Sequence, residues 1–195
     1  MNISSLSDNE LFQQMLNKDT RALEVLYNRY SPLLYPLIYK ITEDEELTDT
    51  VICDLFIIIW KRVPMLDVKA ISPFTWIISL AKNKANDAKR RKLSPEYDQF
   101  PYDDFYEEMY ILPQIVTSGI PIDFDTAKEL KPNVEKALSS LTEAQEHVLL
   151  LGLYGGLTNQ EIADNLNIPL ETVNSKISLA LESLNKNLDL GNYGI

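Results

Sequence analysis

The stretch PFTWIISLAKNKANDAKRRK, residues 73–92, has the period of an amphipathic α-helix with two unlike faces. Wound at about 100° per residue, it gathers small and apolar side chains on one face: Phe74, Ile77, Ala81, Ala85 and Ala88. The opposite face carries polar and basic side chains: Ser79, Lys82, Asn83, Asn86, Lys89 and Arg90. Phe74 and Trp76 stand near its start, and Arg90, Arg91 and Lys92 close it. This pattern suits a nucleic-acid backbone and unstacked bases, but a solvated helix whose terminal cations offset its macrodipole has the same pattern.

The composition is that of a folded globular protein without disulfides. The 195 residues, 45% of them hydrophobic, allow one ordinary domain or two small ones. The single cysteine, Cys53, excludes an internal disulfide, and the single histidine, His147, has no catalytic partner nearby. The sequence has no apolar run as long as a membrane span and a polar, acidic start, so we expect no signal peptide, no membrane insertion and a cytoplasmic location. It also has no Gly-rich phosphate loop, metal-ligand cluster or nucleophile–base signal, which argues against an enzyme, a cofactor or a small-molecule substrate.

The net charge of −11 is unevenly distributed along the chain. Residues 1–92 carry 13 Lys and Arg against 12 Asp and Glu, whereas residues 93–133 carry 2 against 9 and residues 134–195 carry 3 against 8. The total argues against nucleic acid as a partner, but the cations cluster at the end of the first range. The cluster of Lys and Arg at the end of residues 1–92 is therefore a better guide to the partner than the net charge of the whole chain.

Residues 1–92 are predicted to form one all-α domain of about four helices with short connections. A capping box, Ser7–Glu10, starts the first helix. Pro32 and Pro36 are expected to kink or split the long helical segment that follows. Residues 47–60 are helical and apolar nearly all round, and residues 61–72 are predicted to be a loop before the basic helix.

Residues 93–133 change character and are predicted to be an acidic linker. They contain several prolines and aromatic residues, and no helical period holds for long. One short helix is expected over residues 102–112.

Residues 134–195 are predicted to form a second small helical domain. Capping boxes at Thr142–Gln145 and Thr158–Glu161 start two helices, and a turn at residues 167–169 leads into a final amphipathic helix. This arrangement is typical of a helix-turn-helix, although a plain three-helix bundle has the same pattern. The side chains that would face DNA are Thr158, Asn159 and Gln160 at the start of the second capped helix and Thr172, Ser175, Lys176, Leu179 and Glu182 on the final helix.

Taken in order, these motifs resemble a bacterial RNA polymerase sigma factor of the small two-domain, extracytoplasmic-function type within the sigma-70 family. The segments that carry the resemblance are residues 19–35, the clamp-docking segment TDTVICDLFIIIW at 48–60, Phe74-Thr-Trp76, Ala81-Lys-Asn83, Asp87–Arg91, and residues 138–184 with Glu161-Ile-Ala163 and Thr172-Val-Asn-Ser175. The fold that it implies is all-α, with a sigma region 2-like bundle (1–92), the acidic linker (93–133) and a sigma region 4-like helix-turn-helix (134–195).

The resemblance also assigns three sets of site residues. Promoter melting and −10 recognition fall to Phe74, Trp76, Ser79, Lys82, Asn83, Asn86, Lys89, Arg90 and Arg91, with the loop at 61–72. Recognition of the −35 element falls to Thr158, Asn159, Gln160, Thr172, Asn174, Ser175, Lys176 and Leu179. Docking on the polymerase falls to Asp49, Ile52, Cys53, Asp54, Phe56, Ile57 and Trp60.

Some residues depart from the family pattern. Cys53-Asp54 replaces the usual Gln-Glu, Leu179 stands where Arg is common, and Asn174 stands where Lys or Arg is frequent. Because each lost phosphate contact lowers the salt-dependent part of the affinity, the isolated C-terminal domain is predicted to bind −35 DNA weakly.

The implied partners are core RNA polymerase, promoter DNA and an anti-sigma factor. The acidic linker is expected to follow the polymerase's RNA path, where it would present charge of the same sign as RNA. One alternative is a sigma-like decoy that keeps the partner surfaces without productive promoter binding, which the acidic C-terminal domain favours. A weaker alternative is an ordinary helix-turn-helix regulator, which would form stable dimers on palindromic operators.

Overall fold

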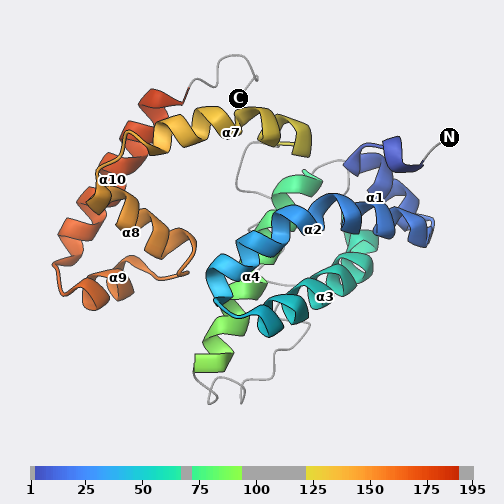
Figure 1. The fold of residues 1–195 in the computed structure, drawn as a ribbon, viewed down its shortest axis with the longest axis horizontal. Helices are drawn as coiled ribbons and strands as arrows, with labels where there is room; N and C mark the ends of the chain where they lie inside the picture. The colour runs from blue at the N-terminus through green and yellow to red at the C-terminus, as the bar shows by residue number, and fades with distance from the viewer. Residues whose placement is uncertain (1–2, 67–71, 94–121, 189–195) are drawn as a thin grey trace. The chain divides into compact units, whose positions relative to one another are not determined.

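The computed structural model describes residues 3–66, 72–93 and 122–188, and all of its regular elements there are helices, which confirms the all-α class (Figure 1). The chain divides into two compact units, Met1–Phe124 and Asp125–Ile195, and each is described by itself. No helix in the three described ranges is long and apolar enough to cross a membrane. The helices of unit 1 are η1 (Ile3–Ser5), α1 (Asp8–Leu16), α2 (Thr20–Thr42), α3 (Glu45–Arg62), η2 (Val63–Met65) and α4 (Pro73–Leu93). Helix α7 (Phe124–Leu138) starts at the last residue of unit 1, and unit 2 continues with α8 (Glu143–Leu153), α9 (Asn159–Leu166) and α10 (Leu170–Asn187).

The predicted capping boxes are present at all three positions. Ser7 and Glu10 cap α1 reciprocally, as Thr142 and Gln145 cap α8 and Thr158 and Glu161 cap α9. Each box satisfies two N–H groups that the first turn of a helix would otherwise leave without a partner. The sequence therefore specifies where these helices begin.

Helix α2 is one continuous helix through Pro32 and Pro36, so the predicted split is wrong. Both prolines are exposed. Each proline removes one backbone hydrogen bond, but on an exposed face water can bind the carbonyl group that has lost its donor. The opposite face of α2 is buried, and its packing keeps the helix intact.

The segment between α3 and α4 also differs from its prediction. Helix α3 runs to Arg62, and η2 follows at Val63–Met65, so the first residues of the predicted loop are helical. Val63 is fully buried, and this explains why the chain stays against the core there. Residues 67–71, the rest of that loop, lie outside the described residues.

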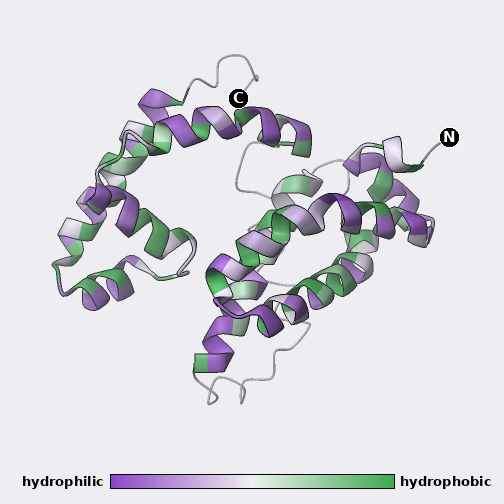
Figure 2. Cartoon of the chain, viewed as in Figure 1, coloured by the Kyte–Doolittle hydropathy of each residue, from purple (hydrophilic) through white to green (hydrophobic). Residues whose placement is uncertain are grey.

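The core of unit 1 lies among α1, α2, α3 and α4. Helix α4 contributes Trp76, Ile77, Leu80, Ala81 and Ala85, and its small residues let it lie close to the neighbouring helices. The core residues from the other three helices are Leu11, Phe12, Met15, Ala22, Leu26, Tyr30, Leu34, Ile38, Ile41, Val51, Ile52, Leu55, Phe56 and Ile59. Figure 2 shows apolar residues along most of α3, in contrast to the hydrophilic last turns of α4.

A buried polar network fastens α1 to α2. The Tyr30 hydroxyl donates to Asp8 Oδ2 at 2.5 Å, and Arg29 pairs with Asp8 while also donating to the Leu6 carbonyl oxygen at 2.8 Å. Burial and the charge of Asp8 raise the pKa of Tyr30 far above its usual value. The phenol is therefore always a donor to Asp8.

Replacing Asp8 with alanine is expected to lower the free energy of unfolding of unit 1 by about 3 kcal/mol, because Tyr30 and Arg29 would lose a shared, buried acceptor. Urea titration followed by tryptophan fluorescence reports on unit 1 alone, since both tryptophans, Trp60 and Trp76, lie there. Asp19→Ala is the control, because Asp19 caps α2 by accepting from the Arg21 N–H and pairs with Arg21 on the surface at 2.7 Å, and it should cost only about 1 kcal/mol. Equal costs for the two variants would show that the network adds nothing to an ordinary surface pair.

Helix α7 begins at Phe124, so the last ten residues of the predicted linker, 124–133, are helical. Pro132 lies inside α7 but is exposed, where solvent can satisfy the carbonyl group that its ring deprives of a donor. The short helix predicted over residues 102–112 lies outside the described residues.

Helices α8, α9 and α10 enclose a small core of their own. Val148, Ile162, Ala163 and Val173 are buried at its centre. The residues that pack around them are Leu151, Leu157, Leu166, Ile168, Leu170 and Ile177. Asn167 ends α9 in the left-handed conformation, and Pro169 precedes α10, which makes the tight turn of the predicted helix-turn-helix.

Candidate nucleic-acid and protein interfaces

Two of the nine residues predicted to contact the −10 strand are core residues of α4. Trp76 is 1% exposed and packs edge-on against Phe12, with ring centroids 5.9 Å apart. Asn86 is 9% exposed and faces the same interior. In the free protein neither side chain is available to stack on an unpaired base, so their contact with DNA stays a prediction. The sequence does not reveal the burial of Trp76, because Trp76 lies one position from Ile77 and a face drawn from Phe74 and the alanines excludes it.

Both of these buried side chains keep a polar atom that has no hydrogen-bond partner among the described residues: Trp76 Nε1 and Asn86 Oδ1. A buried polar atom without a partner costs stability. The packing of the surrounding helices must therefore offset the free-energy cost of burying these two atoms.

Phe74, the other predicted aromatic contact, is half-buried in a cluster of three rings at the start of α4. Its ring lies 6.3 Å from that of Tyr30 and 6.1 Å from that of Phe124, and those two rings are 5.4 Å apart. Ser72 caps this end of the helix by accepting from the Thr75 N–H, and its hydroxyl donates to the Ile122 carbonyl oxygen. The residues at 122–124 thus pack against the start of α4 within unit 1, which sequence reasoning missed because the contact spans some 50 residues.

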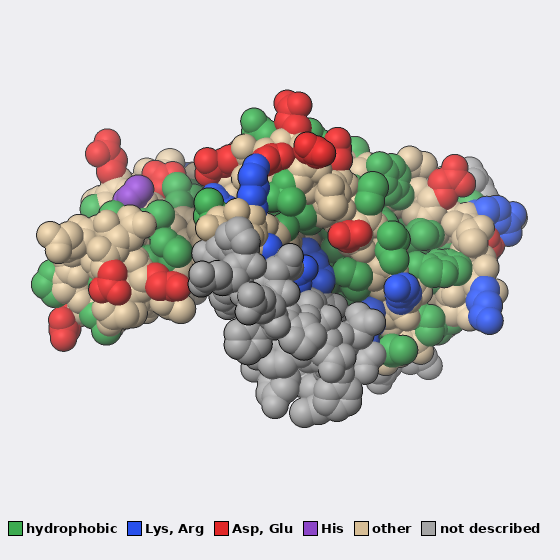
Figure 3. Space-filling view, turned by 90° about the horizontal axis from the view of Figure 1, so that it is seen from below, with side chains coloured by type: hydrophobic (Ala, Val, Ile, Leu, Met, Phe, Trp, Pro, Cys, Tyr) green, Lys and Arg blue, Asp and Glu red, His purple; other side chains and the backbone are tan. Residues whose placement is uncertain are grey.

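The basic end of α4 has the character that the sequence predicts. Lys82, Asn83 and Lys89 are half-exposed, and Arg90 is exposed. Burial lowers the pKa of Lys82. Lys89 and Lys92 form ion pairs with Glu43 and Asp44, which lie in the turn between α2 and α3. Figure 3 shows Lys and Arg side chains in the middle of one face, directly beneath a group of Asp and Glu side chains.

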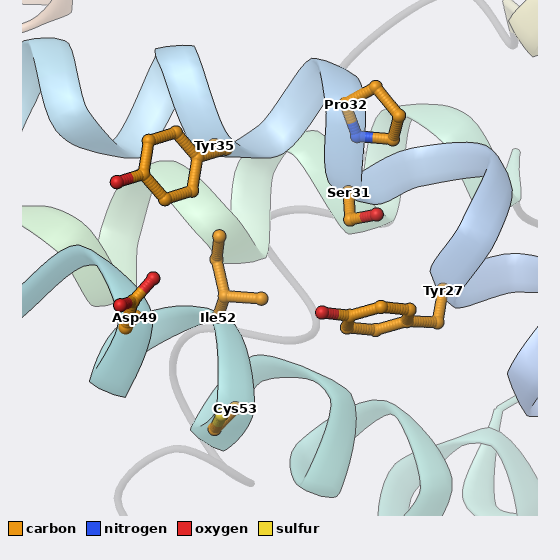
Figure 4. Close-up of a pocket in the computed structure, with 7 residues that line it drawn as sticks. All are labelled: Tyr27, Ser31, Pro32, Tyr35, Asp49, Ile52 and Cys53. Carbon is orange, nitrogen blue, oxygen red and sulfur yellow. The ribbon is translucent and has the colours of Figure 1, made fainter. Parts of the chain in front are cut away.

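A groove of about 590 Å³ opens between α2 and α3. Its lining residues, labelled in Figure 4, are Tyr27, Ser31, Pro32 and Tyr35 of α2 and Asp49, Ile52 and Cys53 of α3. Burial and the charges of Asp49 and Glu45 raise the pKa of Tyr35, so its hydroxyl remains neutral. The groove brings together three of the seven predicted docking residues. Sequence reasoning missed the tyrosines, although their exposed positions eight residues apart on one helix face are a usable signal.

The seven predicted docking residues divide into exposed, half-buried and buried ones. Asp49, Cys53, Asp54 and Ile57 are exposed, and Ile57 is 52% exposed despite being a large apolar side chain. Trp60 is half-buried. Ile52 and Phe56, at 5% and 6% exposed, belong mainly to the core, although Ile52 also lines the groove. Phe56 packs against Tyr27 at 4.9 Å, so it supports the groove from below.

The helix-turn-helix presents most of its predicted DNA-contacting residues to solvent. Asn159, Gln160, Asn174, Ser175 and Leu179 are exposed, while Thr172 and Lys176 are half-buried. The Asn159 amide donates to Asn174 Oδ1 at 2.8 Å, which couples the first turn of α9 to α10. Thr158 is a correction, because its N–H and its hydroxyl both donate to the Glu161 carboxylate within the capping box and are not free for a phosphate.

Within the described ranges no group of His, Cys, Asp and Glu residues could hold a metal ion. What the described surfaces offer instead is a cationic helix end, an aromatic groove with an acidic rim, and a polar recognition-type helix. The cationic helix end can bind phosphates, the groove can bind a partner protein, and the recognition-type helix can approach base edges.

Comparison with known proteins matches both units to one family. The family model for sigma-70 region 2 matches residues 26–93, and the model for sigma-70, region 4 matches residues 132–184. The ECF RNA polymerase sigma factor SigK of Mycobacterium ulcerans is 23% identical over 181 residues, which cover 93% of this chain and 93% of the relative. The ECF RNA polymerase sigma factor RpoE of Cereibacter sphaeroides is 25% identical over 174 residues, which cover 88% and 89%. A solved structure of CnrH in complex with the cytosolic domain of CnrY resembles the chain with a TM-score of 0.43 and 20% identity, covering 93% of this chain and 97% of that chain.

Two region models in the family's order, together with full-length relatives that share one description, agree with the residue-level resemblance. The chain therefore belongs to the sigma-70 family and is a sigma factor of the extracytoplasmic-function type.

Proposed function

We propose that this sigma factor brings core RNA polymerase to promoters by dividing three tasks among its described surfaces. The groove between α2 and α3 docks on the polymerase, the basic end of α4 holds the separated −10 strand, and α10 reads the −35 element. The observation that carries the proposal is the order of the two matched regions, each lying within a unit that has its own core.

The role of α4 rests on charge and position. Its last two turns carry Lys89, Arg90, Arg91 and Lys92 without an intervening acid. Phosphate contacts by such a cluster supply sequence-independent affinity for DNA. A basic surface of this kind can follow the backbone of a separated strand. Ser79, Lys82 and Asn83, all half-exposed on α4, extend this surface toward the start of the helix.

The −35 contact is proposed to be weak by itself. Of the exposed or half-exposed side chains on α10 only Lys176 and Lys186 are basic, so few phosphates are neutralised. Leu179, which is exposed on α10, is placed to meet a thymine methyl group if α10 enters the major groove. An anti-sigma factor that covers these surfaces is a further proposed partner, and the exposed apolar side chains of α10, Leu179 and Leu181, favour such a protein contact.

The direct experiment is reconstitution with core RNA polymerase and run-off transcription on a library of genomic fragments. The proposal predicts transcripts from a defined subset of fragments that appear only when the chain is added. A chain that co-purifies with the polymerase yet starts no transcript would be the sigma-like decoy. Stable dimers that bind palindromic DNA without polymerase would be the ordinary regulator, and neither alternative has support from the comparisons.

Replacing Ile57 with aspartate is expected to weaken binding to core polymerase by at least about tenfold, because a charge would replace an exposed apolar side chain on the proposed docking helix α3. Ile57 is half-exposed, so the fold should lose less than about 0.5 kcal/mol. Competition of labelled and unlabelled chain for core polymerase measures the effect. Leu33→Asp on the exposed side of α2 is the matched control, and an equal effect there would show that the surface is not specific.

A further inference from the structure

The turn between α2 and α3 makes two ion pairs with the basic end of α4. Lys89 Nζ lies 3.2 Å from Glu43 Oε1, and Lys92 Nζ pairs with Asp44 Oδ2. The paired residues are 46 and 48 positions apart in the chain, so the contact is created by the fold. Lys89 and Lys92 are three residues apart on a helix and hence share one face.

The turn is held in a fixed conformation and does not depend on the lysines. Glu43 closes α2 in the left-handed conformation, with φ 56°, and its N–H donates to the Tyr39 carbonyl oxygen at 2.8 Å. The hydroxyls of Thr42 and Thr48, both buried, lie 2.8 Å apart, and Thr48 donates to the Asp44 carbonyl oxygen at 2.7 Å. The carboxylates of Glu43 and Asp44 are therefore presented to α4 from a rigid support.

The two oxygens of the Asp44 carboxylate make different contacts. Oδ1 accepts from the Leu47 N–H at 2.9 Å and caps α3, whereas Oδ2 pairs with Lys92. The Lys92 contact is the main cause of the lowered pKa of Asp44, followed by the Leu47 N–H. The cap needs an oxygen acceptor but no charge, and the ion pair needs the charge.

A carboxylate and a DNA phosphate compete for the same ammonium group, because each forms a charge-assisted hydrogen bond with it. We infer that Glu43 and Asp44 act as internal competitors of promoter phosphates for Lys89 and Lys92, and thereby weaken and regulate the grip of α4 on DNA. The statement about promoter DNA rests on the proposed function. The competition of these carboxylates with any polyanion for the two lysines does not depend on that function. The acidic turn would reduce non-specific binding of DNA by unit 1 before the promoter contacts form.

The test is the pair of substitutions Glu43→Gln and Asp44→Asn, which removes both charges while asparagine retains an oxygen to cap α3. The control is Glu45→Gln with Glu46→Gln, which removes the same charge from the next two residues; within the described residues these make no ion pair with α4. Binding of each reconstituted holoenzyme to a promoter fragment is measured from about 0.05 to 0.3 M salt. The first variant is expected to bind about three- to tenfold more tightly at about 0.15 M salt and with a steeper salt dependence, and the control less than about twofold more tightly.

The gain in promoter affinity must also disappear when Lys89 and Lys92 are absent. In a chain with Lys89→Ala and Lys92→Ala, adding the Glu43 and Asp44 substitutions is expected to change affinity by less than about twofold. Equal gains for the Glu43/Asp44 pair and the Glu45/Glu46 pair would overturn the inference in favour of a general field effect. No gain, or a loss, would overturn it by showing that the carboxylates do not compete for the lysines.

A second measurement separates this inference from the proposed function. The salt concentration that elutes the free chain from immobilised heparin depends on its accessible cations and not on promoter opening. The Glu43/Asp44 variant is expected to elute at higher salt than the native chain and the control. Later elution together with failed transcription would refute the proposed function alone, whereas normal transcription with unchanged elution and affinity would refute the competition alone. Glu43→Gln by itself leaves the Asp44 cap intact and should give part of the gain, which guards against a folding defect.

Discussion

Replacing Lys89, Arg90 and Arg91 together with alanine is expected to lower the affinity of the holoenzyme for promoter DNA on the order of 100-fold at physiological salt. If each cation neutralises one phosphate of the separated strand, the slope of log affinity against log salt should fall by roughly 2. Alanine is the strongest helix former, and the three side chains lie on the half-exposed to exposed end of α4, so the helix should persist. Binding to core polymerase should be unchanged, because the docking groove lies between α2 and α3.

Helix α7 supplies the matched control for this triple variant. Lys128, Lys131 and Lys136 are exposed on α7, and replacing them with alanine removes the same charge from the chain. That variant is expected to keep promoter affinity within about threefold. If both triple variants lose affinity equally, the effect is one of net charge, and the assignment of the −10 strand to α4 is wrong.

Replacing Trp76 with alanine is expected to reduce the free energy of unfolding of unit 1 by about 4 kcal/mol, because a large side chain would leave a cavity against Phe12. Such a loss is comparable with the total stability of many small domains, so core binding and promoter binding should fail together. Urea titration followed by the remaining Trp60 measures the loss. Trp76→Phe should cost much less, since it keeps most of the ring volume and removes the indole N–H that has no partner among the described residues.

The two variants distinguish a surface role from a core role on the same helix. If Trp76→Ala left the fold intact and abolished only promoter opening, the residue would contact DNA as the sequence predicts, and its burial in the free protein would be reversed on binding.

The sequence predicts helix starts well because the signals are local. A Ser or Thr three residues before a Glu or Gln fixes the start of α1, α8 and α9 through hydrogen bonds that span three residues. It predicts proline effects poorly, because Pro32, Pro36 and Pro132 are tolerated only where the missing hydrogen bond faces solvent. Which face is exposed depends on helix packing, and no local pattern reports it.

The predicted site residues divide in the same way. Long cationic side chains such as Lys89 and Arg90 are seldom buried, so their exposure can be predicted from the sequence. Aromatic and amide side chains such as Trp76 and Asn86 fit either a core or an interface, and only the packing decides. The carboxylates of Glu43 and Asp44 could not be assigned to α4 from the sequence, because their contacts join helices far apart in the chain.

Permanganate reactivity of promoter thymines, measured with saturating holoenzyme, tests the central claim that the basic end of α4 holds the opened strand. The account predicts reactive thymines around the −10 element with the native chain and almost none with the Lys89/Arg90/Arg91 variant at equal DNA occupancy. The account would be contradicted by native holoenzyme that assembles and binds promoters normally while every thymine stays protected, or by equal reactivity of the native and variant complexes.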